Sequence, residues 1–189
     1  MKAKHLLITA LIALLTGCVT HENPLVIDPQ TGSVVPQVSA ANQTRKDSHH
    51  ETADNLKDLL DKQFANSSVM IVEIDNSVKV VIPSDPIFKI NDMHLLQKNP
   101  ILHDLAAIMK QFPSADIKVE AFTDSYGNHA KNQALSQERA YAVAEYFMDA
   151  GLTSDHIQAV GYGSGHYITT NKTAKGRSSN RRIIVSITL

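Results

Sequence analysis

Residues 122–140 read FTDSYGNHAKNQALSQERA. An alternating apolar segment ends here, a Ser-Tyr-Gly-Asn turn follows, and an amphipathic pattern then begins, so the stretch predicts a strand, a turn and a helix. Asp124 precedes the turn, and Arg139 lies in the helix, fifteen positions after Asp124. Three roles are open for this acid and base: a salt bridge that holds the turn, a catalytic pair, or a clamp for a ligand that carries both charges.

Outside this stretch, strands and helices alternate along the sequence. Period-two apolar patterns predict strands at 68–74, 78–83, 117–122, 156–163 and 182–189. Helical spacing of apolar residues predicts helices at 99–112 and 128–150, with Asn99-Pro100 as a helix start and Gly151 as a stop. After an initial hairpin strand, this order predicts an α/β (α+β) sandwich of β-α-β-α-β-β connectivity, with helices packed on a mixed sheet.

The N-terminal residues have the pattern of a secretory signal peptide. Lys2 and Lys4 precede the apolar run at 6–15, which as a helix covers about 15 Å and is too short to span a bilayer. We therefore expect residues 1–17 to be a signal peptide. The sequence LTGC at 15–18 resembles the bacterial lipobox, which implies that Cys18 is lipidated, with palmitate among its acyl chains, and that it becomes the mature N-terminus. The alternative is an ordinary signal peptide with a coincidental cysteine.

Three further regions follow the predicted signal peptide. Residues 18–50 contain three prolines among polar residues and are expected to form a lipid-anchored flexible tether. Residues 51–66 are expected to form an amphipathic helix, whose apolar stripe would dock on the following domain or on a partner. Residues 67–189 then form the domain. The apolar stripe of the helix at 51–66 consists of Leu56, Leu59, Leu60 and Phe64.

Composition and spacing argue against several classes of function. The formal net charge is −1, which gives no support for binding of nucleic acid. Asp124, Ser125 and His129 fit no catalytic triad spacing, and no nucleophile elbow accompanies them, so no enzyme is expected. No HExxH or Cys/His ligand spacing occurs, and we therefore expect neither a metal nor a cofactor.

Several motifs occur together in the C-terminal half of the chain. They are PSDPIF at 83–88, TDSYG at 123–127, NQALSQERA at 132–140, GYG at 161–163 and NKTAKGRSSNRR at 171–182. In order and spacing, the chain from about residue 78 to 189 resembles the OmpA-like peptidoglycan-binding domain, which also occurs in Pal lipoproteins and flagellar motor stators. One departure is Phe122, which stands where the family usually has histidine and is expected to change the wall of the pocket.

The resemblance implies a ligand and the residues that bind it. The ligand would be meso-diaminopimelate of the peptidoglycan stem peptide, whose distal carbon carries an ammonium and a carboxylate. Asp124 would accept from the ammonium and Arg139 would bind the carboxylate bidentately. Asn132 and Thr123 would add polar contacts. Residues expected to support the last strand and the rim of the pocket are Arg177, Asn180 and Arg181.

These features predict an outer-membrane lipoprotein that binds peptidoglycan noncovalently, with its domain in the periplasm. Val19, and not Asp, follows the cysteine, and the sorting rule of the bacterial lipoproteins that the chain resembles then implies the outer membrane. In the alternative, the chain is a structural subunit of an envelope machine that uses the fold as a docking module, because a plain wall anchor does not need the extra helix at 52–65 or the hairpin before the family core. Its plan resembles the OmpA-like lipoproteins of Dot/Icm type IVB secretion systems. A purely structural role is also open for the charged pair, in which Asp124 caps the loop and pairs with Arg139 to hold the turn. The two roles are compatible, because an empty clamp is expected to close on itself: without a ligand, Asp124 and Arg139 would form an ion pair.

Overall fold

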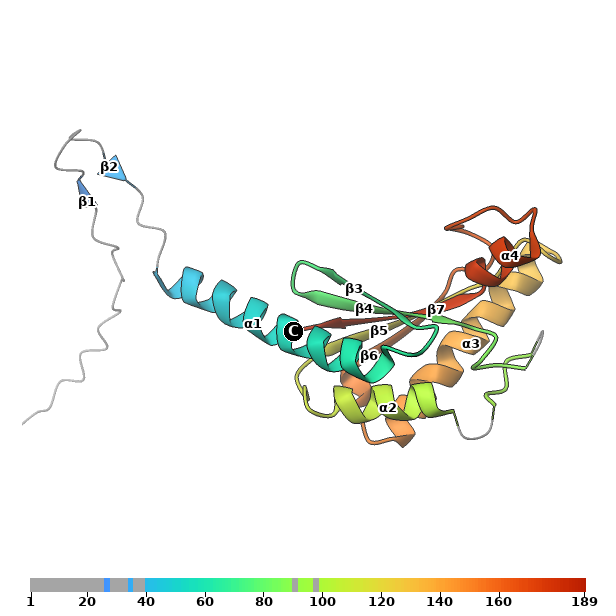
Figure 1. Cartoon of the computed structure of the whole chain (residues 1–189), viewed down its shortest axis with the longest axis horizontal. Helices are drawn as coiled ribbons and strands as arrows, with labels where there is room; N and C mark the ends of the chain where they lie inside the picture. The colour runs from blue at the N-terminus through green and yellow to red at the C-terminus, as the bar shows by residue number, and fades with distance from the viewer. Residues whose placement is uncertain (1–25, 28–33, 36–39, 90–91, 97–98) are drawn as a thin grey trace, which may run out of the picture. The chain divides into compact units, whose positions relative to one another are not determined.

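The structure is a computed structural model that describes residues 26–27, 34–35, 40–89, 92–96 and 99–189, with side chains from residue 52 onward (Figure 1). The chain divides into two units, Met1–Gln43 and Thr44–Leu189. In the first unit, β1 (Val26–Ile27) pairs antiparallel with β2 (Val34–Val35). The predicted signal peptide and Cys18 lie outside the described residues. Within those residues, each helix is too short or too polar to cross a membrane.

The second unit is built on a five-stranded mixed sheet. Its strands are β3 (Met70–Ile74), β4 (Ser77–Pro83), β5 (Asp116–Phe122), β6 (Ile157–Gly161) and β7 (Arg182–Thr188), in the spatial order β3-β4-β7-β5-β6. Only the β5–β6 pair in this sheet is parallel. The sheet confirms the predicted α+β class, and each of its strands corresponds to a predicted one.

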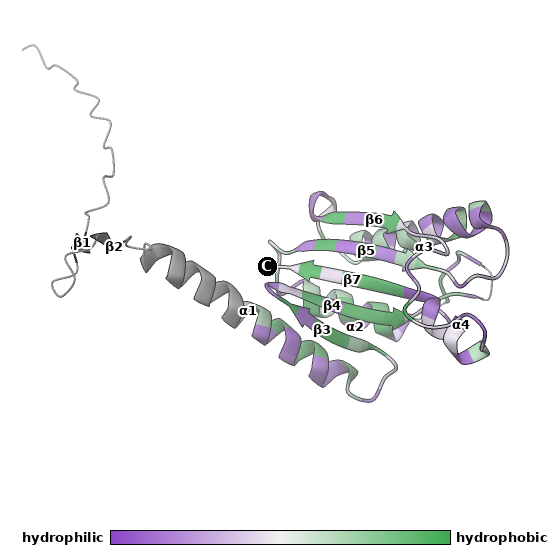
Figure 2. Ribbon diagram, turned by 90° about the horizontal axis from the view of Figure 1, so that it is seen from above, coloured by the Kyte–Doolittle hydropathy of each residue, from purple (hydrophilic) through white to green (hydrophobic). Residues whose placement is uncertain are grey.

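Helices cover one face of this sheet (Figure 2). They are the C-terminal half of α1 (Ala40–Phe64), α2 (Pro100–Met109) and α3 (His129–Asp149), while a short α4 (Ala174–Asn180) precedes β7. The side chains of Asn99 and Asn128 cap α2 and α3 by accepting from backbone N–H groups of the first turn, at 3.2 and 2.8 Å. Gly151, at φ +98°, follows α3 as the sequence predicts.

The strand register aligns buried side chains into three rows on the helix-covered face. These rows are Val78–Ile187–Ile117, Val80–Val185–Val119 and Ile82–Ile183–Ala121. The helices close the core over them with Leu56, Leu60 and Phe64 from α1, Leu102, Leu105 and Met109 from α2, and Val143 and Phe147 from α3. The apolar stripe of α1 therefore packs on its own domain, and the last strand is held centrally between β4 and β5.

The start of α1 and the end of α2 differ from the prediction, and one short helix was not predicted. Helix α1 begins at Ala40, before the predicted start at residue 51. The earlier start was not predicted because the polar residues before Thr52 carry no apolar stripe. Helix α2 ends at Met109, and Phe112 then donates to the Met109 carbonyl in a tighter turn before Pro113. Helix α4 was not predicted, because its sequence AKGRSSN carries no apolar stripe.

Candidate functional site

Antiparallel pairing brings three chain segments together at one edge of the sheet. Pro83 at the end of β4 and Phe122 at the end of β5 both pair with Arg182, the first residue of β7. The residues just after β4, just after β5 and just before β7 therefore meet, although they are far apart in the sequence. They supply Asp85, Asp124 and Arg181.

A cavity of about 410 Å³ opens at this edge. Arg139 reaches it from α3, about three turns from the start of the helix. Among the described residues, its charged lining consists of two acids, Asp85 and Asp124, and four bases, Lys89, Arg139, Arg177 and Arg181. The other lining residues are Ser84, Phe88, Thr123, Tyr126, Asn132 and Leu135. The structure thus brings Asp124, Arg139, Asn132 and Thr123 together around one pocket, with Arg177 and Arg181 beside them.

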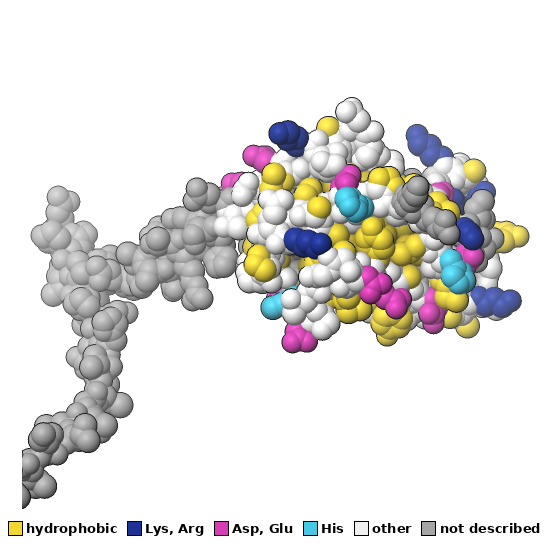
Figure 3. All heavy atoms as spheres, turned by 90° about the horizontal axis from the view of Figure 1, so that it is seen from below, with side chains coloured by type: hydrophobic (Ala, Val, Ile, Leu, Met, Phe, Trp, Pro, Cys, Tyr) yellow, Lys and Arg dark blue, Asp and Glu magenta, His cyan; other side chains and the backbone are white. Residues whose placement is uncertain are grey.

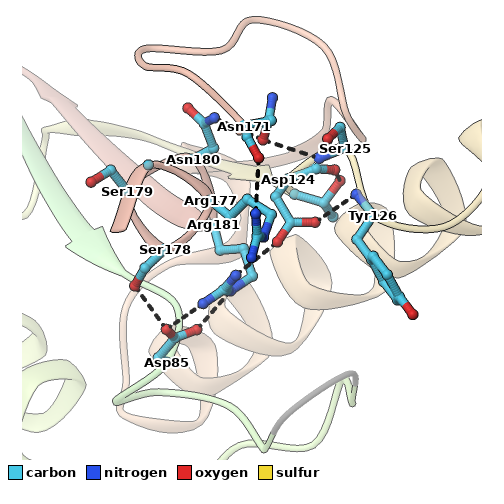
Figure 4. A network of polar contacts seen from close by, with 12 residues as sticks. Asp85, Asp124, Ser125, Tyr126, Asn171, Arg177, Ser178, Ser179, Asn180 and Arg181 are labelled. Atoms are coloured by element: carbon cyan, nitrogen blue, oxygen red, sulfur yellow. Dashed lines mark hydrogen bonds and ion pairs between the residues drawn. The ribbon is translucent and has the colours of Figure 1, made fainter. Parts of the chain in front are cut away.

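Asp124 is a buried carboxylate with two separate protein donors (Figure 4). Its Oδ1 accepts from the backbone N–H of Tyr126 at 2.9 Å, which closes the turn after β5. Its Oδ2 accepts from Nη1 of Arg181 at 2.7 Å. Each carboxylate oxygen has two lone pairs, so Asp124 has acceptor capacity beyond these two bonds, but Arg181 already neutralises its charge.

Arg139 is likewise buried but is held by other groups. Its Nε donates to the carbonyl of Asp92 at 2.8 Å, and its guanidinium carbon lies 4.9 Å from the ring centre of Phe88. A longer contact of 3.5 Å joins Nη2 to the carbonyl of Lys89. Burial lowers the pKa of the Arg139 guanidinium, yet an arginine remains cationic at neutral pH. Within the described part of the chain, Nη1 has no hydrogen-bond partner.

The expectation that an empty clamp closes on itself is wrong. No ion pair joins Asp124 to Arg139 within the described residues, because Arg181 occupies the carboxylate and backbone carbonyls hold the Arg139 side chain. The loop-capping half of the structural interpretation is confirmed by the bond from Tyr126. The two opposite charges are therefore held in the same pocket by independent partners.

Asp85 belongs to the site although it was not predicted as a site residue. Its two oxygens accept from Nε and Nη2 of Arg181, at 2.9 and 2.7 Å, and Oδ2 also accepts from Ser178 Oγ at 3.0 Å. Arg181 thus does more than support the rim, since it bridges both acids of the pocket. The signal for Asp85 was present in the motif PSDPIF, but only the strand register shows that this segment lies beside Arg181.

The remaining predicted residues shape the loops around the pocket. Asn132 Nδ2 donates to the carbonyls of Tyr126 and Asp124, at 3.0 and 3.3 Å, and Thr123 Oγ1 donates to the Asp124 carbonyl at 3.1 Å. Both side chains therefore fix the turn that presents Asp124. Arg177 donates to the carbonyl of Asn171 at 3.0 Å.

Asn180 is fully buried and ties α4 to the loop before it. Its Oδ1 accepts from the backbone N–H groups of Ile168 and Thr169, and its Nδ2 donates to Thr169 and to the side chain of Asn171. The Asn171 side chain in turn accepts from the backbone of Ser125 at 3.2 Å. This chain of bonds joins the loop at 168–171 to the turn after β5, as a supporting residue is expected to do.

The wall of the pocket contains a buried hydroxyl, that of Ser84, without a hydrogen-bond partner among the described residues. The residue is 1 % exposed, and its Oγ has no hydrogen-bond partner within the described chain. A buried hydroxyl without a partner is unfavourable by about 1–3 kcal/mol, and such groups are rare in native structures.

Phe122 does not form part of the pocket wall, contrary to expectation. Its ring stacks on Tyr162 with centroids 5.0 Å apart and lies 3.9 Å from the guanidinium carbon of Arg182. Both neighbours lie on the sheet face that the helices leave uncovered, because Phe122 alternates with the core residue Ala121. The residue that departs from the family pattern therefore lies outside the cavity lining.

Ionisation of Asp85 makes the stability of the fold depend on pH. Hydrogen bonds from Arg181 lower the pKa of the Asp85 carboxyl. A lowered folded-state pKa means that the ionised pair stabilises the fold above about pH 4 and that this contribution is lost as the pH falls further. We expect Asp85→Asn to lower Tm at pH 7 and to lower it less at about pH 2.5. Thermal unfolding followed by circular dichroism at both pH values checks this, and an equal difference at both would contradict it.

Comparison with known proteins identifies the family. The model of the OmpA family matches residues 87–181, which is half of the chain. The chain belongs to the OmpA family. The matched OmpA segment includes Asp124, Asn132 and Arg139, whereas Asp85 lies two residues before it.

Several characterised proteins share this OmpA segment. The chain is 43% identical over 83 residues to outer membrane porin F of Pseudomonas aeruginosa, covering 43% of this chain and 24% of the porin. It is 38% identical over 87 residues to the peptidoglycan-binding protein ArfA of Mycobacterium tuberculosis, covering 46% of this chain and 27% of ArfA. The chain thus spans about a quarter of the length of these relatives.

Solved structures agree with the OmpA fold. A MotB-like protein from Desulfovibrio vulgaris superposes with a TM-score of 0.69 at 18% identity, covering 78% of this chain and 95% of that one. At this identity the likeness concerns the fold, and it extends over the mixed sheet and its helices.

Proposed function

We propose that this chain is an outer-membrane lipoprotein that binds peptidoglycan noncovalently through the diaminopimelate of the stem peptide. One observation carries the proposal: Asp124 and Arg139 line the same cavity, and separate partners keep them from neutralising each other. The distal centre of diaminopimelate carries an ammonium and a carboxylate on one carbon. Asp124 then accepts from the ammonium. Arg139 donates bidentately to the carboxylate, through Nη1, which has no hydrogen-bond partner among the described residues, and through the N–H of Nη2 that does not contact Lys89.

The charge of the pocket favours a ligand with carboxylates over a simple amine. Four basic and two acidic side chains line the cavity, which leaves an excess of positive charge. On the helix-covered side of the molecule, Lys and Arg side chains gather toward the end where α4 and the start of α3 lie (Figure 3). Such a field attracts anionic stem peptides, and a lone ammonium at Asp124 would meet unfavourable neighbours.

Two further lines support the cell-wall proposal. ArfA, which shares the OmpA segment, is a peptidoglycan-binding protein by name, and porin F is an outer-membrane protein. The lipobox-like sequence at Cys18 supplies a membrane anchor, and the residues that follow it separate this anchor from the domain. Together these support a chain with one end in the outer membrane and the other at the wall.

Co-sedimentation with purified sacculi tests the proposal. We expect the full chain in detergent to pellet with diaminopimelate-containing sacculi, and the double variant Asp124→Ala, Arg139→Ala to remain in the supernatant. Lys172→Ala, Lys175→Ala is a matched control, since it removes two exposed charges of the same end without touching the cavity lining. Equal pelleting of wild type and the Asp124/Arg139 variant would contradict the proposed binding mode.

A second candidate is a subunit of an envelope assembly such as a type IV secretion complex, with the fold as a docking module. The burial of the α1 stripe in its own core removes one reason for it. One observation favours it: Met70, Val72 and Ile74 of β3 are exposed side by side on the uncovered face of the sheet. Crosslinking from Val72 in cells would recover a defined lipoprotein neighbour, whereas recovery with sacculi alone would argue against it.

A further inference from the structure

One arginine is shared between the two acids of the pocket (Figure 4). Arg181 donates to Asp124 and to Asp85 at the same time, although the proposed ligand needs the Asp124 carboxylate for its ammonium. We propose that Arg181 is a displaceable counter-ion: it neutralises Asp124 while the pocket is empty, and it stays on Asp85 when the ammonium replaces it. This inference rests on the proposed function and adds Asp85 and Arg181 as positioning residues for the ligand.

The geometry allows Arg181 to release one acid without losing the other. Nη1 alone bonds to Asp124, whereas Nε and Nη2 form a separate bidentate pair with Asp85. A bidentate arginine–carboxylate pair is the stronger and more directional of the two arrangements. Loss of the Nη1 contact therefore leaves the guanidinium still paired, and no isolated charge is created.

The exposed fractions of the two carboxylates also favour release of Arg181 from Asp124 and retention by Asp85. The side chain of Asp124 is 11% exposed, whereas that of Asp85 is 45% exposed. A buried carboxylate needs a charged or hydrogen-bonding partner in both states, first Arg181 and then the ammonium. Asp85 has solvent and Ser178 as further partners, so it can hold Arg181 in both states.

Backbone hydrogen bonds of Arg181 hold its main chain in place, so that only its side chain moves when the contact to Asp124 is lost. The carbonyl of Arg181 accepts from the N–H of Ser84 at 2.9 Å, and its own N–H donates to the carbonyl of Arg177 at 3.0 Å. These bonds fix Arg181 between α4 and β7, while its side chain remains 29% exposed and has room to move. Hydrogen bonds to Asp85 and then Asp124 raise the pKa of Arg181, so the arginine keeps its charge throughout.

A double-mutant cycle tests the shared counter-ion. Without the Asp85 carboxylate, Asp124 is the one remaining anionic partner of Arg181 among the described residues, and Arg181 competes more strongly with the ligand. We expect Asp85→Asn to weaken binding of a meso-diaminopimelate tripeptide to the full chain about tenfold by calorimetry. In an Arg181→Gln background, where the competitor is absent, the same change should alter the affinity by less than about twofold.

Two outcomes overturn the inference. An equal loss from Asp85→Asn in both backgrounds means that Asp85 contacts the ligand itself, and no loss in either means that Arg181 does not compete. Failure of the wild type to bind the tripeptide overturns the proposed function and this inference together. Where the wild type binds, Asp124→Ala tests the proposed function separately, because this change abolishes binding only if the pocket is the site.

A bound structure gives a readout that does not depend on affinity. With the tripeptide present, we expect the Arg181 Nη1–Asp124 Oδ2 distance to open from 2.7 Å to beyond hydrogen-bond reach, while both bonds to Asp85 persist. An Arg181–Asp124 contact that stays intact beside a bound ammonium would overturn the inference, even if the variants lose affinity through altered folding.

Discussion

Replacement of Arg139 with alanine should weaken binding of a diaminopimelate tripeptide at least about a hundredfold. Hydrogen bonds between charged groups contribute about 1.5–3 kcal/mol each, and the proposed bidentate contact contains two of them. Removal of both corresponds to about 3 kcal/mol or more, hence two decades in Kd. Isothermal titration of the purified chain measures this change directly.

Matched variants separate charge from geometry in that experiment. Arg139→Lys keeps the charge but loses the planar fork, so we expect a loss of about tenfold. Arg177→Lys is the control, because the Arg177 side chain donates to the backbone carbonyl of Asn171. This substitution should change the affinity less than about threefold. An Arg139→Ala variant that folds and still binds within threefold of wild type would contradict the assigned role.

The second large effect concerns Gly161 and the stability of the fold. A Cβ at this position would lie 2.2 Å from the backbone nitrogen of Gln137 and 2.6 Å from the carbonyl carbon of Ser136, both in α3. Backbone atoms of a packed helix cannot rotate away as a side chain can. We expect Gly161→Ala to lower the free energy of unfolding by about 3 kcal/mol, measured by urea denaturation.

The close approach at Gly161 also positions the site. Gln133 and Gln137 of α3 bond to the backbone of β6 at Gly161 and Ala159, which fixes the helix that carries Arg139. Gly165→Ala is the control, since its Cβ would meet only the carbonyl oxygen of Tyr162, at 3.2 Å, and a loss below about 1 kcal/mol is expected. Equal destabilisation by the two substitutions would contradict this explanation.

The sheet and the long helices could be predicted because their signals are local. The alternation in β4, β5 and β7 follows the three buried rows, and Asn99 and Asn128 cap their helices from adjacent positions. Helix α4 and the first turns of α1 carry no apolar stripe, so no periodic signal was available for them. Polar sequence can form helix when caps and neighbouring structure support it.

The site was predicted less completely than the fold. Motif resemblance indicated Asp124 and Arg139, which line one pocket as expected. It did not indicate that Arg181 pairs with Asp124, or that Asp85 holds Arg181. Those contacts depend on the register that pairs β4 and β5 with the start of β7. This register joins segments that are far apart in the chain, and it could not be predicted from one sequence.

The central claim is that one pocket recognises an ammonium and a carboxylate on the same carbon. Titration of the wild-type chain with two tripeptides that differ only in the third residue tests it most directly. Lysine retains the ammonium but lacks the distal carboxylate, so Arg139 would remain without its anion. We predict that the meso-diaminopimelate tripeptide binds at least about tenfold more tightly than the lysine tripeptide. Equal affinity for the two would contradict the account.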